Sequence, residues 1–145
     1  MSNENVIDRP IDETAKAFKT LRDFVGSQQI KCMVDLCRKG EERGHFKDKV
    51  RDMAELIRTM PKTYEQDGKG QDAVVSLHYF KGGMDWYITE KDIEMPNEPG
   101  QHQAFGLANL GQGGELGYIS IVELTGSGVE LDLYWTPKTL KEIAA

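Results

Sequence analysis

Hydrophobic residues recur at helical spacing through the first half of the chain. Three segments show this pattern: residues 14–25, 28–39 and 45–60. Each gathers its apolar residues into a stripe along one side of a helix, as is typical of an amphipathic helix packed on a core. Gly26 and Gly40 follow the first two stripes, where glycine commonly ends a helix, and Pro61 stops the third. The pattern therefore predicts a three-helix segment over residues 14–60.

In the second half, the hydrophobic period changes from helical spacing to two. Alternating apolar and polar residues predict five strands: residues 73–80, 86–90, 103–110, 115–121 and 129–135. Residues 81–84 form a tight, glycine-containing connection typical of a hairpin, and a second glycine-rich turn covers residues 111–114. Short connections of this kind join antiparallel neighbours, so we expect an antiparallel sheet over residues 72–136.

Helices followed by strands, without alternation between the two, predict an α+β fold. We expect a single domain over residues 13–145, in which the three helices pack on one face of a sheet of about five strands. The first twelve residues are polar, contain Pro10 and lack periodicity, which predicts a disordered tail over residues 1–12. A chain of 145 residues is long enough to bury a substantial core.

The chain is acidic, with 18 Lys and Arg against 24 Asp and Glu and a formal net charge of -6. Nucleic-acid-binding surfaces usually need clustered Lys and Arg, so this balance disfavours nucleic acid as a partner. An accessory nucleic-acid-binding domain stays an alternative, with Tyr79, Trp86 and Tyr87 able to stack on bases. The apolar runs are far shorter than the roughly 20 residues that cross a bilayer, and the N-terminus lacks signal-peptide features. We therefore expect a cytoplasmic protein with no membrane partner.

Cys32 and Cys37 are the two cysteines, and their spacing differs from those of common zinc sites. Five residues apart on a helix, their side chains point about 140° away from each other, so we expect two reduced thiols. The histidines, His45, His78 and His102, show no metal-binding spacing, and no nucleophile motif accompanies them. The sequence thus predicts no metal, no cofactor and no catalytic residue.

Carboxylates gather at the ends of the predicted strands. Glu90 and Asp92 follow the second strand at a spacing of two, and Glu115 opens the fourth. Such groups can hold a divalent cation, act as a general acid or bind an arginine of a partner. Solvation or pairing on an open sheet face is the structural alternative. His102 lies at a strand start near acidic residues and joins this group.

Trp86 and Tyr118 add aromatic surface to the same strands. A strand tryptophan either anchors a core or recognises a partner, and the sequence leaves both roles open for Trp86. We therefore predict six binding residues: Trp86, Glu90, Asp92, His102, Glu115 and Tyr118.

Four segments carry a resemblance to a known family: His78-Tyr79-Phe80, Asp85 to Glu90, Ala104 to Ala108 and Glu115 to Ser120. In this order they resemble an uncharacterised domain family of small proteins encoded by bacterial plasmids and phages. A related block occurs in large polyvalent mobile-element proteins beside helicase and methylase domains. The resemblance covers the region 60–140. Val129-Glu130 stands where the family more often carries an Arg-Asp pair, which removes any role for that arginine here.

The resemblance implies a mobile-element origin and brings no established activity with it. It favours a non-enzymatic module that binds a protein, such as a host defence or DNA-processing factor. A small hydrolase or metal-dependent enzyme stays an alternative, with Glu90, Asp92, His102 and Glu115 around one cleft. That alternative predicts that Glu90, His102 and Glu115 converge in a pocket.

Overall fold

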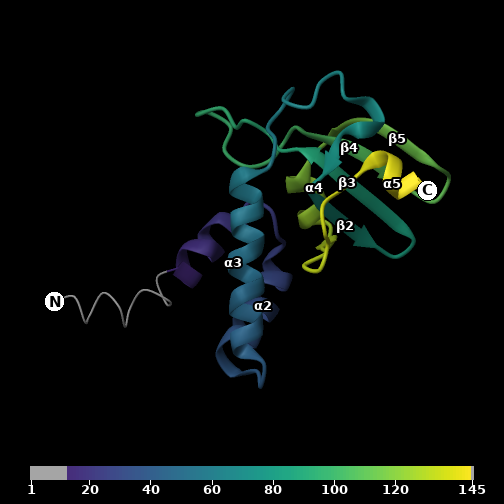
Figure 1. Ribbon diagram of the computed structural model, residues 1–145. Coiled ribbons are helices and arrows are strands. Elements are labelled where there is room, and N and C mark those ends of the chain that lie inside the picture. Colours follow the sequence, from purple (N-terminus) through teal and green to yellow (C-terminus); the bar gives the residue numbers. More distant parts are fainter. Residues whose placement is uncertain (1–12, 145) are drawn as a thin grey trace.

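The structure is a computed structural model in which residues 13–144 are described (Figure 1). It confirms the predicted α+β fold, because N-terminal helices precede a five-stranded antiparallel sheet and lie on one side of it. The predicted tail, residues 1–12, lies outside the described residues. Within the described part, no helix combines the length and apolarity that a bilayer-spanning segment needs.

The described residues form three helices before the sheet, close to the predicted segments. The first covers residues 13–21, and α2 (Ser27–Lys39) and α3 (Arg43–Thr59) follow it. The prediction for the first helix is too long, because the chain leaves the helix after Leu21 in a turn that buries Phe24 and Val25. Gly26 is accordingly the N-cap residue of α2 and does not end the first helix.

Both cysteines lie on α2 as free thiols, which confirms the prediction of two reduced side chains. Cys32 is exposed, whereas Cys37 belongs to the main core. Burial shields the Cys37 thiol from solvent and raises its pKa. The exposed Cys32 is therefore the more accessible of the two to chemical modification.

The sheet has the strand order β5-β4-β3-β2-β6 with antiparallel neighbours throughout. Its strands are β2 (Leu77–Lys81), β3 (Met84–Glu90), β4 (Ala104–Asn109), β5 (Gly114–Ile119) and β6 (Glu130–Leu131). The strands from β2 to β5 form the predicted meander, and β6 pairs with the other side of β2. No further strand within residues 13–144 pairs with the outer side of β5, which is therefore a free edge of the sheet.

The predicted fourth strand is too long at its C-terminal end. β5 stops at Ile119, and Ser120 caps a short helix, α4 (Ile121–Gly126), by accepting a hydrogen bond from the Glu123 amide at 3.2 Å. A serine three residues before a glutamate is a helix-start signal. The cue for α4 therefore lies inside the apolar run that alternation assigns to a strand.

The C-terminal residues cover part of the sheet face that the helices leave open. The predicted first strand splits into β2 and a separate β1 (Val74–Val75), which pairs with β7 (Lys138–Thr139). The predicted fifth strand is reduced to β6, because the Asp132 carboxylate accepts the Tyr134 amide proton and turns the chain. Two short helical elements complete this layer: η1 (Gly70–Asp72) and α5 (Leu140–Ala144).

The main core lies between the helices and one face of the sheet, which we call the inner face. Tyr79 and Trp86 project from this face and belong to one buried cluster with helix residues that include Leu21 and Ile57. The opposite face, which we call the outer face, carries a second and smaller cluster that includes Val75. The two faces therefore differ, since the helices cover the inner face and short C-terminal elements cover only part of the outer one.

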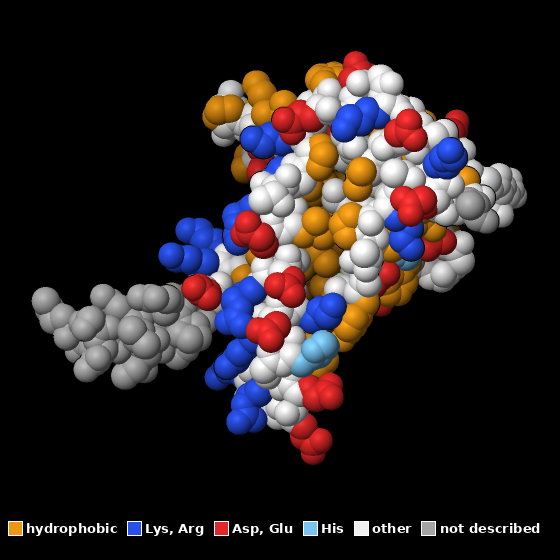
Figure 2. All heavy atoms as spheres, in the orientation of Figure 1, with side chains coloured by type: hydrophobic (Ala, Val, Ile, Leu, Met, Phe, Trp, Pro, Cys, Tyr) orange, Lys and Arg blue, Asp and Glu red, His pale blue; other side chains and the backbone are white. Residues whose placement is uncertain are grey.

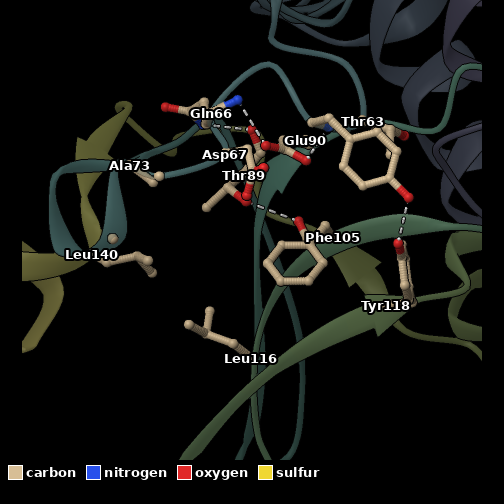
Figure 3. A pocket seen from close by; sticks show the side chains of 13 residues that line it. Thr63, Gln66, Asp67, Ala73, Thr89, Glu90, Phe105, Leu116, Tyr118 and Leu140 are labelled. Atoms are coloured by element: carbon tan, nitrogen blue, oxygen red, sulfur yellow. Dashed lines mark hydrogen bonds between the residues drawn. The ribbon is translucent and has the colours of Figure 1, made fainter.

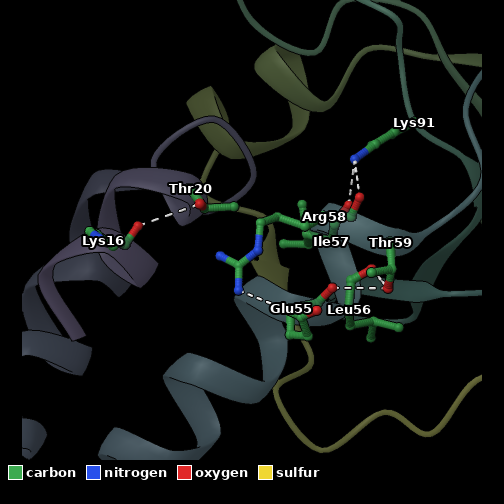
Figure 4. A network of polar contacts seen from close by, with 8 residues as sticks. All are labelled: Lys16, Thr20, Glu55, Leu56, Ile57, Arg58, Thr59 and Lys91. Carbon is green, nitrogen blue, oxygen red and sulfur yellow. Dashed lines mark hydrogen bonds and ion pairs between the residues drawn. The ribbon is translucent and has the colours of Figure 1, made fainter. Parts of the chain in front are cut away.

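Lys91 joins the end of β3 to the C-terminus of α3 (Figure 4). Its ammonium donates to the carbonyl oxygens of Ile57 at 2.6 Å and of Arg58 at 3.3 Å, where the unpaired carbonyls of the last turn favour a cation. Burial lowers the pKa of Lys91, and the positive charge of Lys62 lowers it further. This contact fixes the end of β3 against the helices, directly after the residues of the candidate site.

Candidate functional site

The outer face of the sheet is hollowed beside the free edge strand β5. A cavity of about 400 Å³ lies there between the sheet, the loop of residues 63–70 and α5 (Figure 3). Pockets that hold small ligands or single side chains of a partner are of this size or somewhat larger.

The floor and one wall of the cavity are apolar. Phe105 of β4 and Leu116 of β5 lie on one side, and Leu140 and Ala73 lie opposite them. The strand register explains this arrangement, because Phe105 pairs with Tyr118 and alternate residues of a strand share a face. Leu116 is 48% exposed, so part of this apolar surface faces solvent.

A β-bulge directs Glu90 into the wall of this cavity. Ile88 pairs with Gly106 and Glu90 pairs with Phe105, so Thr89 is an extra residue on β3. Without the bulge, Thr89 would stand opposite Phe105, and Glu90 would turn to the inner face. The irregularity in β3 is therefore what brings a carboxylate to the outer face.

Glu90 is only 6% exposed, and it holds the loop above the cavity. One carboxylate oxygen accepts the amide proton of Tyr64 and the other accepts that of Gln66, both at 2.8 Å. Gln66 is also buried, and its side-chain amide hydrogen-bonds the backbone of Val74 and Thr89. The loop is thus fastened to the sheet through two buried polar side chains whose hydrogen bonds are satisfied.

The negative charge of Glu90 has no cationic partner among residues 13–144. Its hydrogen bonds come from neutral amides, and the ion pairs of the described chain involve other residues. Burying a carboxylate is costly even when amides solvate it, and a nearby cation offsets that cost. The wall of the cavity is therefore an electronegative site.

Tyr64 and Tyr118 form an aromatic rim at the mouth of the cavity. Their hydroxyls hydrogen-bond at 3.0 Å, and the rings of Tyr118 and Phe105 form a T-shaped pair with 5.6 Å between centroids. Tyr64 has a φ of 73°, a left-handed backbone that bulky residues rarely adopt, and the contacts to Glu90 and Tyr118 hold it there. The hydrogen bond with Tyr64 raises the pKa of Tyr118, and the carboxylates of Glu90 and Asp67 add to the rise.

The residues predicted from the sequence lie in separate parts of the fold. Glu90 and Tyr118 line the cavity. Trp86 belongs to the main core on the inner face, where it is 9% exposed. Glu115 is exposed and pairs with Ala108, so it projects to the inner side of β5.

Asp92 and His102 organise a different loop. The Asp92 carboxylate accepts backbone amide protons within that loop, among them that of His102 at 3.2 Å. The His102 ring is exposed, and its Nε2 lies 3.0 Å from the carbonyl oxygen of Pro99. Glu90, His102 and Glu115 therefore do not converge in one pocket, which the enzyme alternative requires.

Four of the residues that line the cavity carry no functional signal of their own in the sequence: Tyr64, Gln66, Phe105 and Leu116. Tyr64 and Gln66 fall in a stretch whose composition indicates only a turn, and the other two are ordinary strand hydrophobics. Strand pairing offers one usable cue. Alignment of the third and fourth predicted strands across their glycine-rich turn places Phe105, Leu116 and Tyr118 on one face.

A second polar cluster lies elsewhere on the outer face. Nε2 of His78 lies 2.7 Å from Asp85, its Nδ1 lies 3.1 Å from Asp132, and the ring stacks on Tyr87 with 4.9 Å between centroids. Trp135 packs against the imidazole at 5.0 Å. Each ring nitrogen of His78 is hydrogen-bonded to a carboxylate, so neither nitrogen is available to bind a substrate or a metal ion.

A second cavity, of about 380 Å³, adjoins the first along β4 and β5. Leu107 and Ile143 line it, and it shares Leu116 and Leu140 with the first cavity. We call the two cavities together the outer groove. The outer groove follows the free edge of the sheet, with the aromatic rim and Glu90 at one end.

In residues 13–144, no group of His, Cys, Asp and Glu side chains is arranged to hold a metal ion. No protein-family model, curated protein or solved structure matches this chain.

Proposed function

We propose that the protein is a non-enzymatic interaction module whose outer groove binds a protein partner. The observation that carries the proposal is the apolar and aromatic surface gathered at the free edge of the sheet. Tyr64, Leu116 and Tyr118 contribute to this surface and are 67%, 48% and 56% exposed. Contiguous exposed apolar side chains, above all aromatic ones, are typical of protein-binding sites.

The exposed edge of β5 supports the same proposal. An unpaired strand edge offers backbone amides and carbonyls to a strand of another chain. Proteins usually block such edges with charges, prolines or a covering segment. β5 contains no proline and one charged residue, Glu115, and most of its residues are exposed.

The resemblance of the strand motifs to plasmid- and phage-borne proteins supports a mobile element as the source. The partner is then a host defence or DNA-processing protein, an assignment by analogy with the context of that family. We place the protein in the cytoplasm, where an exposed thiol such as that of Cys32 stays reduced.

The charge distribution disfavours nucleic acid in the outer groove. Residues 61–144, which form the sheet half, contain thirteen Asp and Glu against six Lys. The helical half, residues 13–60, contains eleven Lys and Arg against eight Asp and Glu, and Figure 2 shows basic side chains along these helices. An acidic surface around the groove favours a partner with a positive patch over a polyanion.

The proposal predicts that a charge placed in the groove removes the partner. Tagged wild-type protein and the Leu116→Asp variant are incubated with nuclease-treated lysate of the organism that encodes the protein, and captured proteins are identified by mass spectrometry. We expect capture of one protein to fall at least roughly tenfold with Leu116→Asp, because the contact would bury an unpaired carboxylate.

Leu36→Asp is the matched control. Leu36 lies on α2 and is 38% exposed, so the same change is made at a similar surface outside the outer groove. Capture by wild type and Leu36→Asp, with loss in Leu116→Asp, supports the proposal. Equal capture by all three proteins contradicts it, as does a partner that is captured only from a parallel lysate without nuclease.

A further inference from the structure

We propose that the cavity receives a cationic side chain, lysine or arginine, from an extended partner segment that pairs with β5. The inference rests on the proposed function, because it names what the partner inserts into the outer groove. Three features of the cavity carry it: a buried carboxylate without a counter-ion, an aromatic rim and an apolar floor.

The buried carboxylate supplies the charge complementarity. Glu90 lines the cavity, is 6% exposed and forms no ion pair within residues 13–144. Asp67 also lines the cavity and adds negative charge near its mouth. A cation that enters the cavity is attracted by both carboxylates.

The aromatic rim also attracts a positively charged side chain. The faces of tyrosine and phenylalanine rings attract ammonium and guanidinium groups that approach within about 6 Å. Tyr64, Tyr118 and Phe105 all line the cavity, and the Tyr64–Tyr118 hydrogen bond fixes two of these rings in place. Carboxylates combined with aromatic rings select a cation over a neutral or acidic group.

The apolar floor suits the rest of a lysine or arginine side chain. The methylenes of these residues pack on hydrophobic surface while their charged ends reach a polar site. Leu116, Phe105 and Leu140 offer such surface between the edge strand and the cavity wall. A cavity of about 400 Å³ is large enough for either side chain.

The free edge positions the inserting residue. A strand paired with β5 lies about 4.8 Å from it and directs alternate side chains to the outer face. Those side chains stand beside Leu116 and Tyr118, which line both the edge and the cavity. From there a long side chain extends over β5 and brings its charge to Tyr118 and the mouth of the cavity, whereas a short one does not. Glu90 belongs to β3, three strand spacings from the partner strand, so it attracts that charge across the cavity and not by direct contact.

A set of three synthetic peptides tests the inference on the full-length protein. Each is acetylated, amidated and built of threonine and valine, and they differ only at the central residue, which is lysine, norleucine or glutamate. Binding is measured by amide chemical-shift titration. We expect the lysine peptide to bind roughly tenfold more tightly than the norleucine peptide. The shifts should be concentrated on β5 and on residues 63–70.

Two tyrosine variants sharpen the test. Tyr118→Leu should weaken the lysine peptide at least roughly fivefold and change the norleucine peptide less than about twofold, because only a cation gains from the ring. Tyr134→Leu is the control, since Tyr134 is 59% exposed and does not line the cavity. It should leave both affinities unchanged.

Some outcomes overturn the inference while the proposed function stands. Equal affinity for lysine and norleucine, tighter binding of glutamate, or no lysine-dependent binding at millimolar concentration each excludes a cation site. A dimer in sedimentation that dissociates with Leu116→Asp identifies a second copy as the occupant and also overturns it. Lysate capture that is insensitive to Leu116→Asp, by contrast, removes the proposed function itself.

Discussion

Replacement of Gly106 by alanine is expected to lower the free energy of unfolding by about 3 kcal/mol or more. An ideal Cβ at this position lies 2.0 Å from the Tyr87 carbonyl oxygen and 3.0 Å from the Ile88 Cα, both in the backbone of β3. A backbone obstacle cannot rotate away as a side chain does, so β3 and β4 must separate beside the bulge. Thermal denaturation should show a midpoint lowered by roughly 10 °C.

Gly117→Ala is the matched control for this prediction. Gly117 pairs with Gly106 across β4 and β5, and a Cβ there meets nothing within 4 Å. Its midpoint should stay within a few degrees of wild type, since alanine fits the extended backbone. Similar midpoints for Gly106→Ala and Gly117→Ala would show that the two strands do not approach as closely as described.

Replacement of Glu90 by glutamine is expected to loosen the loop and to remove cation binding together. A glutamine retains one acceptor oxygen and directs an NH₂ group at the second amide, either Tyr64 or Gln66. The unsatisfied buried donors should cost about 2 kcal/mol. Hydrogen exchange should become faster at the amides of residues 63–70, and the lysine peptide should bind at least roughly tenfold more weakly.

Glu41→Gln removes the same charge at an exposed position between α2 and α3, outside the outer groove, and serves as the control. It should change neither the exchange of the loop amides nor the affinity for the lysine peptide by more than about twofold. If Glu90→Gln leaves loop exchange at the wild-type rate, then the carboxylate does not fasten the loop. If Glu41→Gln weakens the peptide as much as Glu90→Gln, net charge alone explains the effect.

The regular part of the fold follows from local patterning. The stripes of α2 and α3 and the alternation in β2 to β5 depend on residues close in sequence, so periodicity identifies them. The errors occur where a side chain overrides periodicity. Ser120 starts a helix inside an apolar run, and Asp132 turns the chain out of the fifth strand by accepting the Tyr134 amide proton.

The candidate site is harder to predict because it depends on contacts between distant segments. The sequence predicts Glu90 as a binding residue because it is a carboxylate at a strand end. The face of the sheet on which Glu90 lies depends on the bulge at Thr89, and the alternation of apolar and polar residues does not reveal that bulge. Tyr64 joins Tyr118 across 54 residues, and the turn-like composition around it hides the contact. Trp86 is the opposite case, a predicted binding residue that lies in the core. The sequence alone does not distinguish a core aromatic from an exposed one on a strand, and only the strand register assigns Trp86 to the inner face.

Site-specific photo-crosslinking tests the central claim, that the outer groove is the partner-binding surface. Benzoylphenylalanine replaces Tyr118 in one protein and Tyr134 in another, and both are irradiated in nuclease-treated lysate of the organism that encodes the protein. Both tyrosines are exposed, at 56% and 59%, but only Tyr118 lines the cavity. The account predicts one discrete protein adduct from position 118 that Leu116→Asp abolishes, and none from position 134. An adduct that forms only from position 134, or one from position 118 that survives Leu116→Asp, would contradict it.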